Sequence, residues 1–434
     1  MNSKNKIFLT LLSGFLVMIS LTTFLTGCSS SSPSSTAPTN TAPIPAPSTT
    51  AAPTTTTPAP TAALKHIKIG TIMGLTGPLS VPSLAFNRGW GFYADAMREQ
   101  GGIQIGNDHY VFDFINEDSK GTPEGAGTAA TKLVTQDGVK FIIGAMLESE
   151  VDAIYQITQP AGVLYAMANI NIPGSPSDVK PSKPLLVRLS VSPDDNQPID
   201  LGYIVKTYPN AKTIAVSAPD IGYEGMIDAL KTEAAARGLT VNYVEKWAWG
   251  TTDFVPTFTR ILSYKPDVIF AMNSGQANDQ LRAARQLGFK GPFISNSPLG
   301  ADVFINTVKD PNYLTDVIVN SPDIYHPNAA ITALMQRWQA KYPTDPFVSD
   351  SIHSYDMPWI LAQAMVKAQS IDPAKVMATL ETMTKPGDLQ VNFGAAYMDG
   401  MARFGENAVL YRPFPITRIM NGKTEFVGFF NPEK

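Results

Sequence analysis

Residues 67–72 read IKIGTI, and residues 74–78 directly after them read GLTGP. The first run is short and rich in β-branched residues, which is typical of a buried strand. Glycine and proline in the second run predict a loop, and residues 84–100 are predicted to form a helix that ends at the glycine pair 101–102. A strand, a loop at its carboxyl end and a helix together form the unit of an α/β fold.

The same alternation continues downstream of this unit. Strands are predicted at residues 111–115, 141–145 and 163–167, with helices at residues 122–136 and 149–158 between them. A regular succession of strands and helices favours a parallel sheet with helices on both faces.

A second series of strands and helices begins near residue 213. Strands are predicted at residues 213–217, 241–246 and 268–272, with a helix that ends at Gly238 and another at residues 278–287. The chain after residue 63, about 370 residues, is longer than one hydrophobic core usually needs. We therefore predict an α/β fold with two doubly wound lobes joined by a hinge, and a cleft at the carboxyl ends of the strands.

The amino-terminal segment has the pattern of a secretory signal. Lys4 and Lys6 precede an apolar stretch at residues 7–25, and residues 25–28 read LTGC. The only cysteine of the 434-residue chain, Cys28, ends this run. The run resembles the lipobox of bacterial lipoproteins, in which the signal is removed before a cysteine that carries lipid. The alternative is an uncleaved membrane-spanning helix, since the stretch is about long enough to span a bilayer.

The segment that follows Cys28 is expected to be a disordered tether. Residues 29–63 are almost entirely Ser, Thr, Pro and Ala, and none of them is charged. Such a composition has too few apolar groups to offset the entropic cost of folding. O-linked glycans on this tract are neither indicated nor excluded by its composition.

Composition and motifs argue against several functional classes. The net charge is −4, with 33 basic and 37 acidic residues, so no basic surface for nucleic acid is expected. The four histidines lack metal-ligand spacing, and no Gly-x-Ser-x-Gly elbow or complete P-loop is present. Glu148, Glu150 and Asp152 form an acidic group that could suggest catalysis or a metal. We favour the simpler interpretation that the helix dipole stabilises carboxylates at a helix start. We expect no catalytic residue, no cofactor and no metal.

An ordered set of short motifs carries a more specific resemblance. It consists of residues 76–78 (TGP), 101–103 (GGI), 141–144 (FIIG), Arg188 with Asp195, 220–222 (DIG), 250–254 (GTTDF), 266–267 (PD), 284–288 (ARQLG) and 354–356 (SYD). Across nearly the whole folded region, the chain resembles the type I periplasmic binding proteins of ABC importers, in the branch of the leucine/isoleucine/valine-binding proteins. Each motif is weak alone, but their order over about 350 residues is specific.

The resemblance sets the expected domain boundaries. They are a signal peptide at residues 1–27, the lipidated Cys28 and linker at 28–63, the first part of lobe I at 64–190, lobe II at 191–320, a return segment of lobe I at 321–388, and a C-terminal segment at 389–434 that packs mainly on lobe II.

The resemblance also implies a function. Two lobes close on a small solute by hinge bending, and the closed form delivers the solute to a membrane permease driven by an ATPase. The protein is then expected to be a monomer, held by the lipid on Cys28 at the outer side of the cell membrane. A ligand-sensing receptor subunit with the same fold is the alternative, and an anchored enzyme is a third class.

Candidate ligand contacts follow from the loops that the resembled family uses. In lobe I they are the first loop and helix start, a hydroxyl position after the third strand, and a second contact after the next strand: Leu79, Ser80, Glu148, Ser149, Asn169 and Asn171. In lobe II the corresponding loops contribute Ile221, Tyr223, Trp249, Thr251 and Asn273.

Two of these positions depart from what an amino-acid binder needs. Counting from Gly144 places Glu148 where a hydroxyl would bind the ligand carboxylate, and a carboxylate there would repel it. Thr251 stands where an acidic side chain would bind the ligand ammonium. The hypothesis is a neutral, cationic or aromatic solute, and a one-residue shift that places Ser149 at the carboxylate site would restore the amino-acid ligand.

Overall fold

The structure is a computed structural model, which describes residues 63–77, 80–145, 147–168, 178–190, 193–220, 223–248, 250–272, 276–296, 300–320, 324, 327–344, 347 and 349–431. All of these residues belong to one compact unit, Pro60–Lys434. The predicted signal peptide, Cys28 and nearly all of the predicted tether lie outside the described residues.

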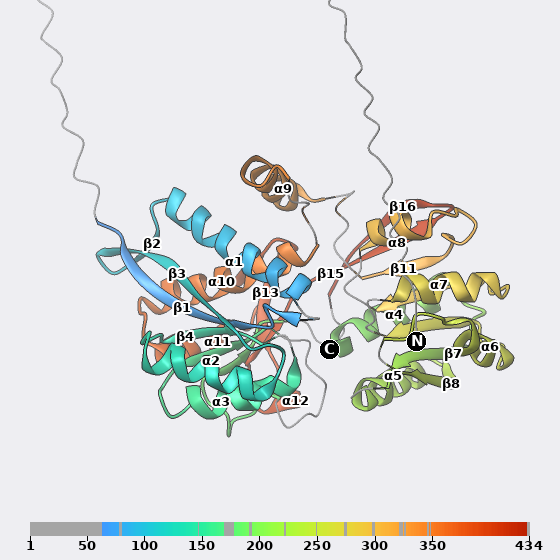
Figure 1. The fold of residues 1–434 in the computed structure, drawn as a ribbon, viewed down its shortest axis with the longest axis horizontal. Coiled ribbons are helices and arrows are strands. Elements are labelled where there is room, and N and C mark those ends of the chain that lie inside the picture. The colour runs from blue at the N-terminus through green and yellow to red at the C-terminus, as the bar shows by residue number, and fades with distance from the viewer. Residues whose placement is uncertain are drawn as a thin grey trace, which may run out of the picture. The chain divides into compact units, whose positions relative to one another are not determined.

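The first sheet is mixed and mostly parallel. Among the described residues its strand order is β12-β13-β14-β6-β5-β4-β1-β3-β2 (Figure 1). The strands from β14 to β3 in this row are parallel to one another, whereas β2, β13 and β12 join the sheet by antiparallel pairing. The strands are β1 (Lys65–Met73), β2 (Ile103–Ile105), β3 (Asp108–Asp118), β4 (Phe141–Gly144), β5 (Leu164–Met167), β6 (Leu186–Arg188), β12 (Leu389–Val391), β13 (Gly394–Asp399) and β14 (Val409–Tyr411).

Helices from both ends of the chain accompany this sheet. They are α1 (Ser80–Glu99), α2 (Pro123–Thr135), the short 3-10 helix η2 (Glu148–Glu150), α3 (Val151–Thr158), α9 (Ala329–Lys341), α10 (Ser349–Ala368), α11 (Pro373–Thr382) and α12 (Met401–Phe404). Local signals start several of them: Thr122 caps α2 by accepting a hydrogen bond from the backbone N–H of Gly125, and Pro123 follows as the first helical residue. Helix α1 begins one turn earlier than the sequence predicts.

The second sheet has the order β16-β15-β11-β10-β9-β7-β8 among the described residues. Its parallel strands are β7 (Thr213–Pro219), β8 (Thr240–Trp247), β9 (Val268–Met272), β10 (Phe293–Asn296) and β11 (Val317–Val319), and its antiparallel strands are β15 (Phe414–Met420) and β16 (Lys423–Phe430). The associated helices are α4 (Pro193–Thr207), α5 (Glu224–Ala236), α6 (Val255–Ser263), α7 (Ala277–Gln286) and α8 (Ala301–Val308).

The second sheet is buried on both faces, as the continuous apolar strands predict. Ile269 and Phe293 belong to one hydrophobic cluster, whereas their strand neighbours Val268, Phe270 and Ile294 belong to another on the opposite face. Alternate residues of one strand therefore support two separate helix layers.

The chain passes between the two sheets at three places. These are the segments after β6, after β11 and between β14 and β15. The C-terminal segment differs from expectation, because residues 389–411 extend the first sheet and only residues 414–430 join the second. The physical reason is that β14 pairs in parallel with β6. Without β14, β6 would be an edge strand with unpaired backbone groups, and the sequence pattern does not reveal this.

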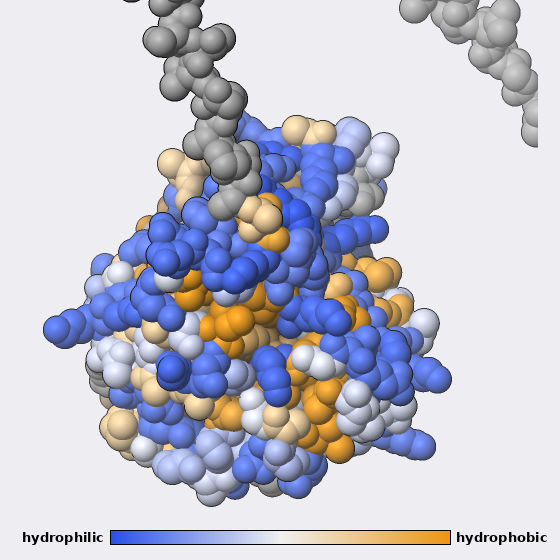
Figure 2. Space-filling view, turned by 90° about the vertical axis from the view of Figure 1, so that its left-hand side faces the viewer, coloured by the Kyte–Doolittle hydropathy of each residue, from blue (hydrophilic) through white to orange (hydrophobic). Residues whose placement is uncertain are grey.

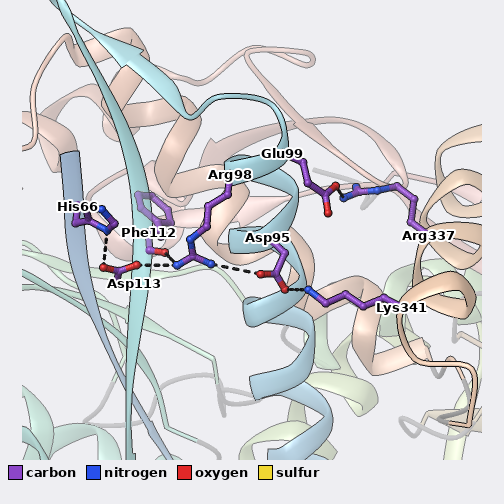
Figure 3. Close-up of polar contacts among 8 residues, drawn as sticks. All are labelled: His66, Asp95, Arg98, Glu99, Phe112, Asp113, Arg337 and Lys341. Atoms are coloured by element: carbon purple, nitrogen blue, oxygen red, sulfur yellow. Dashed lines mark hydrogen bonds and ion pairs between the residues drawn. The ribbon is translucent and has the colours of Figure 1, made fainter. Parts of the chain in front are cut away.

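Helix α9, which follows the second crossing, is held against α1 by ion pairs. Arg337 binds Glu99 at 2.8 Å, and Lys341 binds Asp95 (Figure 3). The pairs continue along α1 to Arg98, which binds Asp113 at 2.7 Å. All of these groups are partly exposed, so they orient α9 but each contributes little to stability.

The face in Figure 2 is mostly hydrophilic, with apolar residues gathered in a band across its centre and lower part. Such bands are ordinary on folded proteins, where much of the surface is apolar. Within the described part of the chain, no helix combines the length and the apolar character needed to cross a bilayer.

Candidate functional site

Loops at the carboxyl ends of the parallel strands form the candidate site. In lobe I, the loop after β1 is held by Asp118 at the end of the neighbouring strand β3. Its carboxylate accepts hydrogen bonds from the Thr76 hydroxyl at 2.6 Å and from the backbone N–H of Leu75 at 2.9 Å. Burial acts to raise the pKa of Asp118, but the donors from Thr76, Lys120 and Leu75 outweigh it and lower the pKa overall. Asp118 therefore remains ionised and fixes this loop.

The loop after β4 is fixed from inside the lobe. The backbone N–H of Ala145 donates to the buried Tyr165 hydroxyl at 3.1 Å, and the N–H of Leu147 donates to the Glu150 carboxylate at 2.8 Å. Glu150 is fully buried. This member of the acidic group therefore orders the loop that carries Glu148 and Ser149.

Gly144 allows β4 to lie against β1 where this loop begins. A Cβ atom at Gly144 would lie 2.2 Å from the carbonyl oxygen of Ile72, and the residue has a φ of +153°. Both conditions exclude a side chain.

We expect Gly144→Ala to lower the free energy of unfolding by about 1–3 kcal/mol, because the backbone of β1 or β4 must move. Urea unfolding measures the change. Gly127→Ala in α2 is the matched control, because its nearest atoms outside the helix lie 3.9 Å from the added Cβ. An equal cost for both variants would contradict this explanation.

The structure brings the described candidates of lobe I to one edge of the sheet. Strands β1 and β4 are neighbours, and Ile72 pairs with Gly144, so the loops that lead to Ser80 and to Glu148 lie side by side. Ser80 and Glu148 are half-buried and Ser149 is exposed. The predicted contacts Leu79, Asn169 and Asn171 lie outside the described residues.

Two candidates of lobe II also come from neighbouring strands. Pro219 pairs with Trp247, so the loops carrying Tyr223 and Thr251 are adjacent. Tyr223 is buried in a core cluster at the start of α5, and the Thr251 hydroxyl donates to the carbonyl of Ala248 at 2.7 Å. The predicted contacts Ile221, Trp249 and Asn273 lie outside the described residues.

Three other side chains on or beside these loops have structural partners. The Asp253 carboxylate accepts a hydrogen bond from the backbone N–H of Val255 at the start of α6. The Trp247 indole is buried and donates to Ser217, and the Tyr155 hydroxyl donates to the carbonyl of Pro184 at 3.1 Å. These residues stabilise their lobes.

Sequence patterns did not reveal a buried polar group at the carboxyl edge of the second sheet. Asp200 of α4 accepts a hydrogen bond from the Asn320 amide at 2.5 Å, and Asn296 at the end of β10 also interacts with it. Burial raises the pKa of Asp200 to about 7, although the two amides act in the opposite direction. The only sequence signal for Asn296 and Asn320 is their position at the ends of strands. Asp200 has no such signal, because α4 has no clear apolar periodicity that would mark its buried face.

A second buried polar group lies where the chain leaves the first sheet. Arg188 at the end of β6 is 0% exposed and lies 4.0 Å from Asp178 and 3.7 Å from Asp195. Nearby, Arg412 lies 3.8 Å from Asp356 of α10. Burial lowers the pKa of Arg412 to about 10 and raises that of Asp356 to about 7. This group, named here the hinge cluster (Asp178, Arg188, Asp195, Asp356 and Arg412), joins elements next to two of the three crossings.

The described residues contain no group of three or more His, Cys, Asp or Glu side chains placed to hold a metal. The candidate site consists of the loops at the carboxyl ends of the parallel strands in both sheets. Buried polar groups lie next to these strand ends. This arrangement, in which a scaffold of strands fixes loops at its edge, is typical of binding proteins.

Comparison with known proteins agrees with this class. The family profile described as periplasmic binding protein matches residues 66–423. The chain therefore belongs to the periplasmic binding protein family, whose members act outside the cytoplasm. It is 25% identical to the Leu/Ile/Val-binding protein BraC3 of Rhizobium johnstonii over 331 residues, which cover 73% of this chain and 84% of BraC3.

Another relative is the leucine-, isoleucine-, valine-, threonine- and alanine-binding protein of Pseudomonas aeruginosa, 24% identical over 73% of this chain and 83% of the relative. Solved structures show the fold. The LivJ protein of Streptococcus pneumoniae with isoleucine has a TM-score of 0.67 at 18% identity and covers 85% of this chain and 100% of LivJ. A solute-binding protein of R. palustris with 4-hydroxybenzoate has a TM-score of 0.64 at 19% identity and covers 85% and 98%. The fold is that of the type I periplasmic binding proteins of ABC transporters.

Proposed function

We propose that this protein is a lipid-anchored, extracytoplasmic solute-binding protein that captures a small molecule between its lobes and delivers it to an ABC importer. The arrangement of the two sheets carries the proposal, because each presents loops at the carboxyl ends of its parallel strands and three crossings join them. Hinge closure on a ligand needs such a division into two lobes. The LTGC run ending at Cys28 supports the anchor.

We further propose that the solute lacks the paired carboxylate and ammonium of an α-amino acid. Glu148 follows β4 on a loop that Glu150 fixes, at the position expected to bind a ligand carboxylate. In lobe II, the hydroxyl of Thr251 is bound to Ala248, and Asp253 is bound at the start of α6. The solved relatives include proteins with isoleucine and with 4-hydroxybenzoate, so this fold accommodates both kinds of ligand.

A thermal-shift screen of the purified protein tests this proposal. The compounds are leucine, isoleucine and valine, then benzoate, 4-hydroxybenzoate, benzamide and 1,4-diaminobutane. A ligand at about 100 times its dissociation constant stabilises the folded state by about 2.7 kcal/mol, which raises the melting temperature measurably. We expect the three amino acids and the two benzoates, which all carry a carboxylate, to give no shift, and benzamide or 1,4-diaminobutane to give a clear one.

The variant Glu148→Gln tests whether the carboxylate of Glu148 is what excludes amino acids from this fold. If the carboxylate excludes amino acids, the variant should gain a response to leucine, with an affinity about tenfold higher than that of the unmodified chain. Ser149→Ala is the control, because it leaves the charge at residue 148 in place. A strong leucine shift in the unmodified protein would show that Glu148 does not exclude the amino acid.

A further inference from the structure

A second cavity lies in lobe I, away from the loops described above. Its volume is about 610 Å³, and it opens between the turn before β6, helix α11, helix α12 and the residues that precede β14. Strands β6 and β14 run parallel, so this cavity lies at their amino ends, on the edge opposite to the candidate site. A solute held at the carboxyl edge would not reach it.

The walls of this cavity are largely apolar. They include Pro181, Pro184, Leu185, Ala374, Met377 and Met401. Met401 is exposed although it is large and apolar, so the cavity is open to a ligand from solution. An apolar lining suits an aliphatic chain.

Two carboxylates share this apolar space. Glu381, in the last turn of α11, is half-buried, and Glu406, on the segment before β14, is only 9% exposed. The Oε1 atom of Glu406 has no hydrogen-bond partner among the described residues. Asn407 is close, but its amide donates to the backbone carbonyl of Glu381 at 3.3 Å and not to either carboxylate.

Among the described residues, neither carboxylate has a basic partner. None of the described residues that line the cavity is Lys, Arg or His. On the turn before β6, the ammonium of Lys183 donates to Asp152 at 2.6 Å and lies over the Tyr155 ring. Burial and the neighbouring Glu381 raise the pKa of Glu406 to about 7, and burial also raises the pKa of Glu381.

A buried, unpaired carboxylate in an apolar cavity is costly, and a cation that enters the cavity relieves the cost. Among the described residues, no third His, Cys, Asp or Glu joins these two carboxylates in a group placed to hold a metal ion. An ammonium on an aliphatic chain matches both the charge and the walls.

We propose that this cavity binds a small organic cation, with the ammonium between Glu381 and Glu406 and the aliphatic chain against Met377 and Met401. This site is independent of the solute bound at the carboxyl edge of the sheets.

Methyl NMR of the intact chain, labelled at methionine, tests the proposal. The probe is butylammonium at pH 8, and butanol is the uncharged control of the same shape. Met377→Leu and Met401→Leu identify the two methyl signals. Butylammonium should shift both signals in a saturable manner, and butanol should not.

Charge variants then identify the carboxylates. Glu381→Gln and Glu406→Gln should each weaken binding of butylammonium by about tenfold or more, whereas Glu99→Gln, at an exposed ion pair outside the cavity, should leave it unchanged. At pH 5.5, where Glu406 holds a proton, the unmodified protein should bind at least about tenfold more weakly. Tyr155 is the other titratable group influenced by Glu406, and its pKa, raised by burial and Glu406 to about 12, keeps it neutral throughout.

Two results would overturn the proposal. One is an equal response to butanol, which would mean that the cavity binds only the aliphatic chain. The other is undiminished binding in Glu381→Gln. If Glu406→Gln fails to fold, Glu381→Gln and the pH series still decide between these outcomes.

Discussion

Replacing Arg188 by methionine is expected to lower the free energy of unfolding by about 3–5 kcal/mol. The guanidinium is fully buried, and both nearby carboxylates, Asp178 and Asp195, are 5% exposed. Methionine fills similar space but removes the positive charge, so the hinge cluster is left with an excess buried negative charge. Loss of one partner of a buried ion pair costs far more than loss of an exposed one.

Urea unfolding of Arg188→Met and Arg337→Met measures this difference. Arg337 also forms an ion pair, with Glu99, but both side chains are about a third or more exposed, so its loss should cost at most about 1 kcal/mol. Similar values for the two variants would mean that water reaches the hinge cluster and screens it.

The second large effect is a fall in stability as the pH rises from about 4 to about 7. Burial raises the pKa of Asp200 from 3.8 to about 7. Between these values the folded protein holds a proton that the unfolded chain has lost, so the stabilisation is complete below pH 3.8 and is lost as the pH passes 7. A shift of this size corresponds to about 4 kcal/mol for one carboxyl group.

Asp200→Asn isolates this contribution. The amide keeps an oxygen that can accept the Asn320 hydrogen bond but cannot ionise. We expect the variant to melt higher than the unmodified protein at pH 8, and to keep less than half of that gain at pH 5. Asp228→Asn is the control, because Asp228 is exposed and paired with Lys231. A lower melting temperature for Asp200→Asn at pH 8 would mean that the folded state stabilises an ionised Asp200.

Much of the fold was predictable from local patterns. The run at residues 67–72 and the continuous apolar run at residues 268–272 both form buried parallel strands, because short apolar segments between helices have few other ways to be buried. The destination of residues 389–411 was not predictable. The sheet that these strands join is decided by tertiary packing, and no residue pattern in the segment favours the first sheet over the second.

The candidate site was predictable in its loops but not in the groups behind them. Counting from Gly144 located the loop of Glu148, and Glu150 was recognised only as a carboxylate near a helix start. Its hydrogen bond with Leu147 is a local capping contact, but the usual signal for it has Ser or Thr, not Leu, at the capping position. The association of Asp200 with Asn320 joins residues far apart in the sequence, so it depends on packing. Of the predicted contacts, Ser80, Glu148, Ser149, Tyr223 and Thr251 are described, and their contact with a ligand stays a prediction.

The pairing of β6 with β14 has a mechanical consequence. The backbone N–H of Arg188 donates to the carbonyl of Ala408 at 2.8 Å, so two of the three crossings start from neighbouring strands, β6 and β14, which are named here the strap. We expect the strap to bend across its flat side more readily than it stretches or shears, so hinge bending of the lobes should favour one direction. The cost of that bend then contributes equally to the binding of every solute. A substitution in the strap would change the affinities for all solutes by a common factor, whereas a substitution in the loops would change which solute binds most tightly.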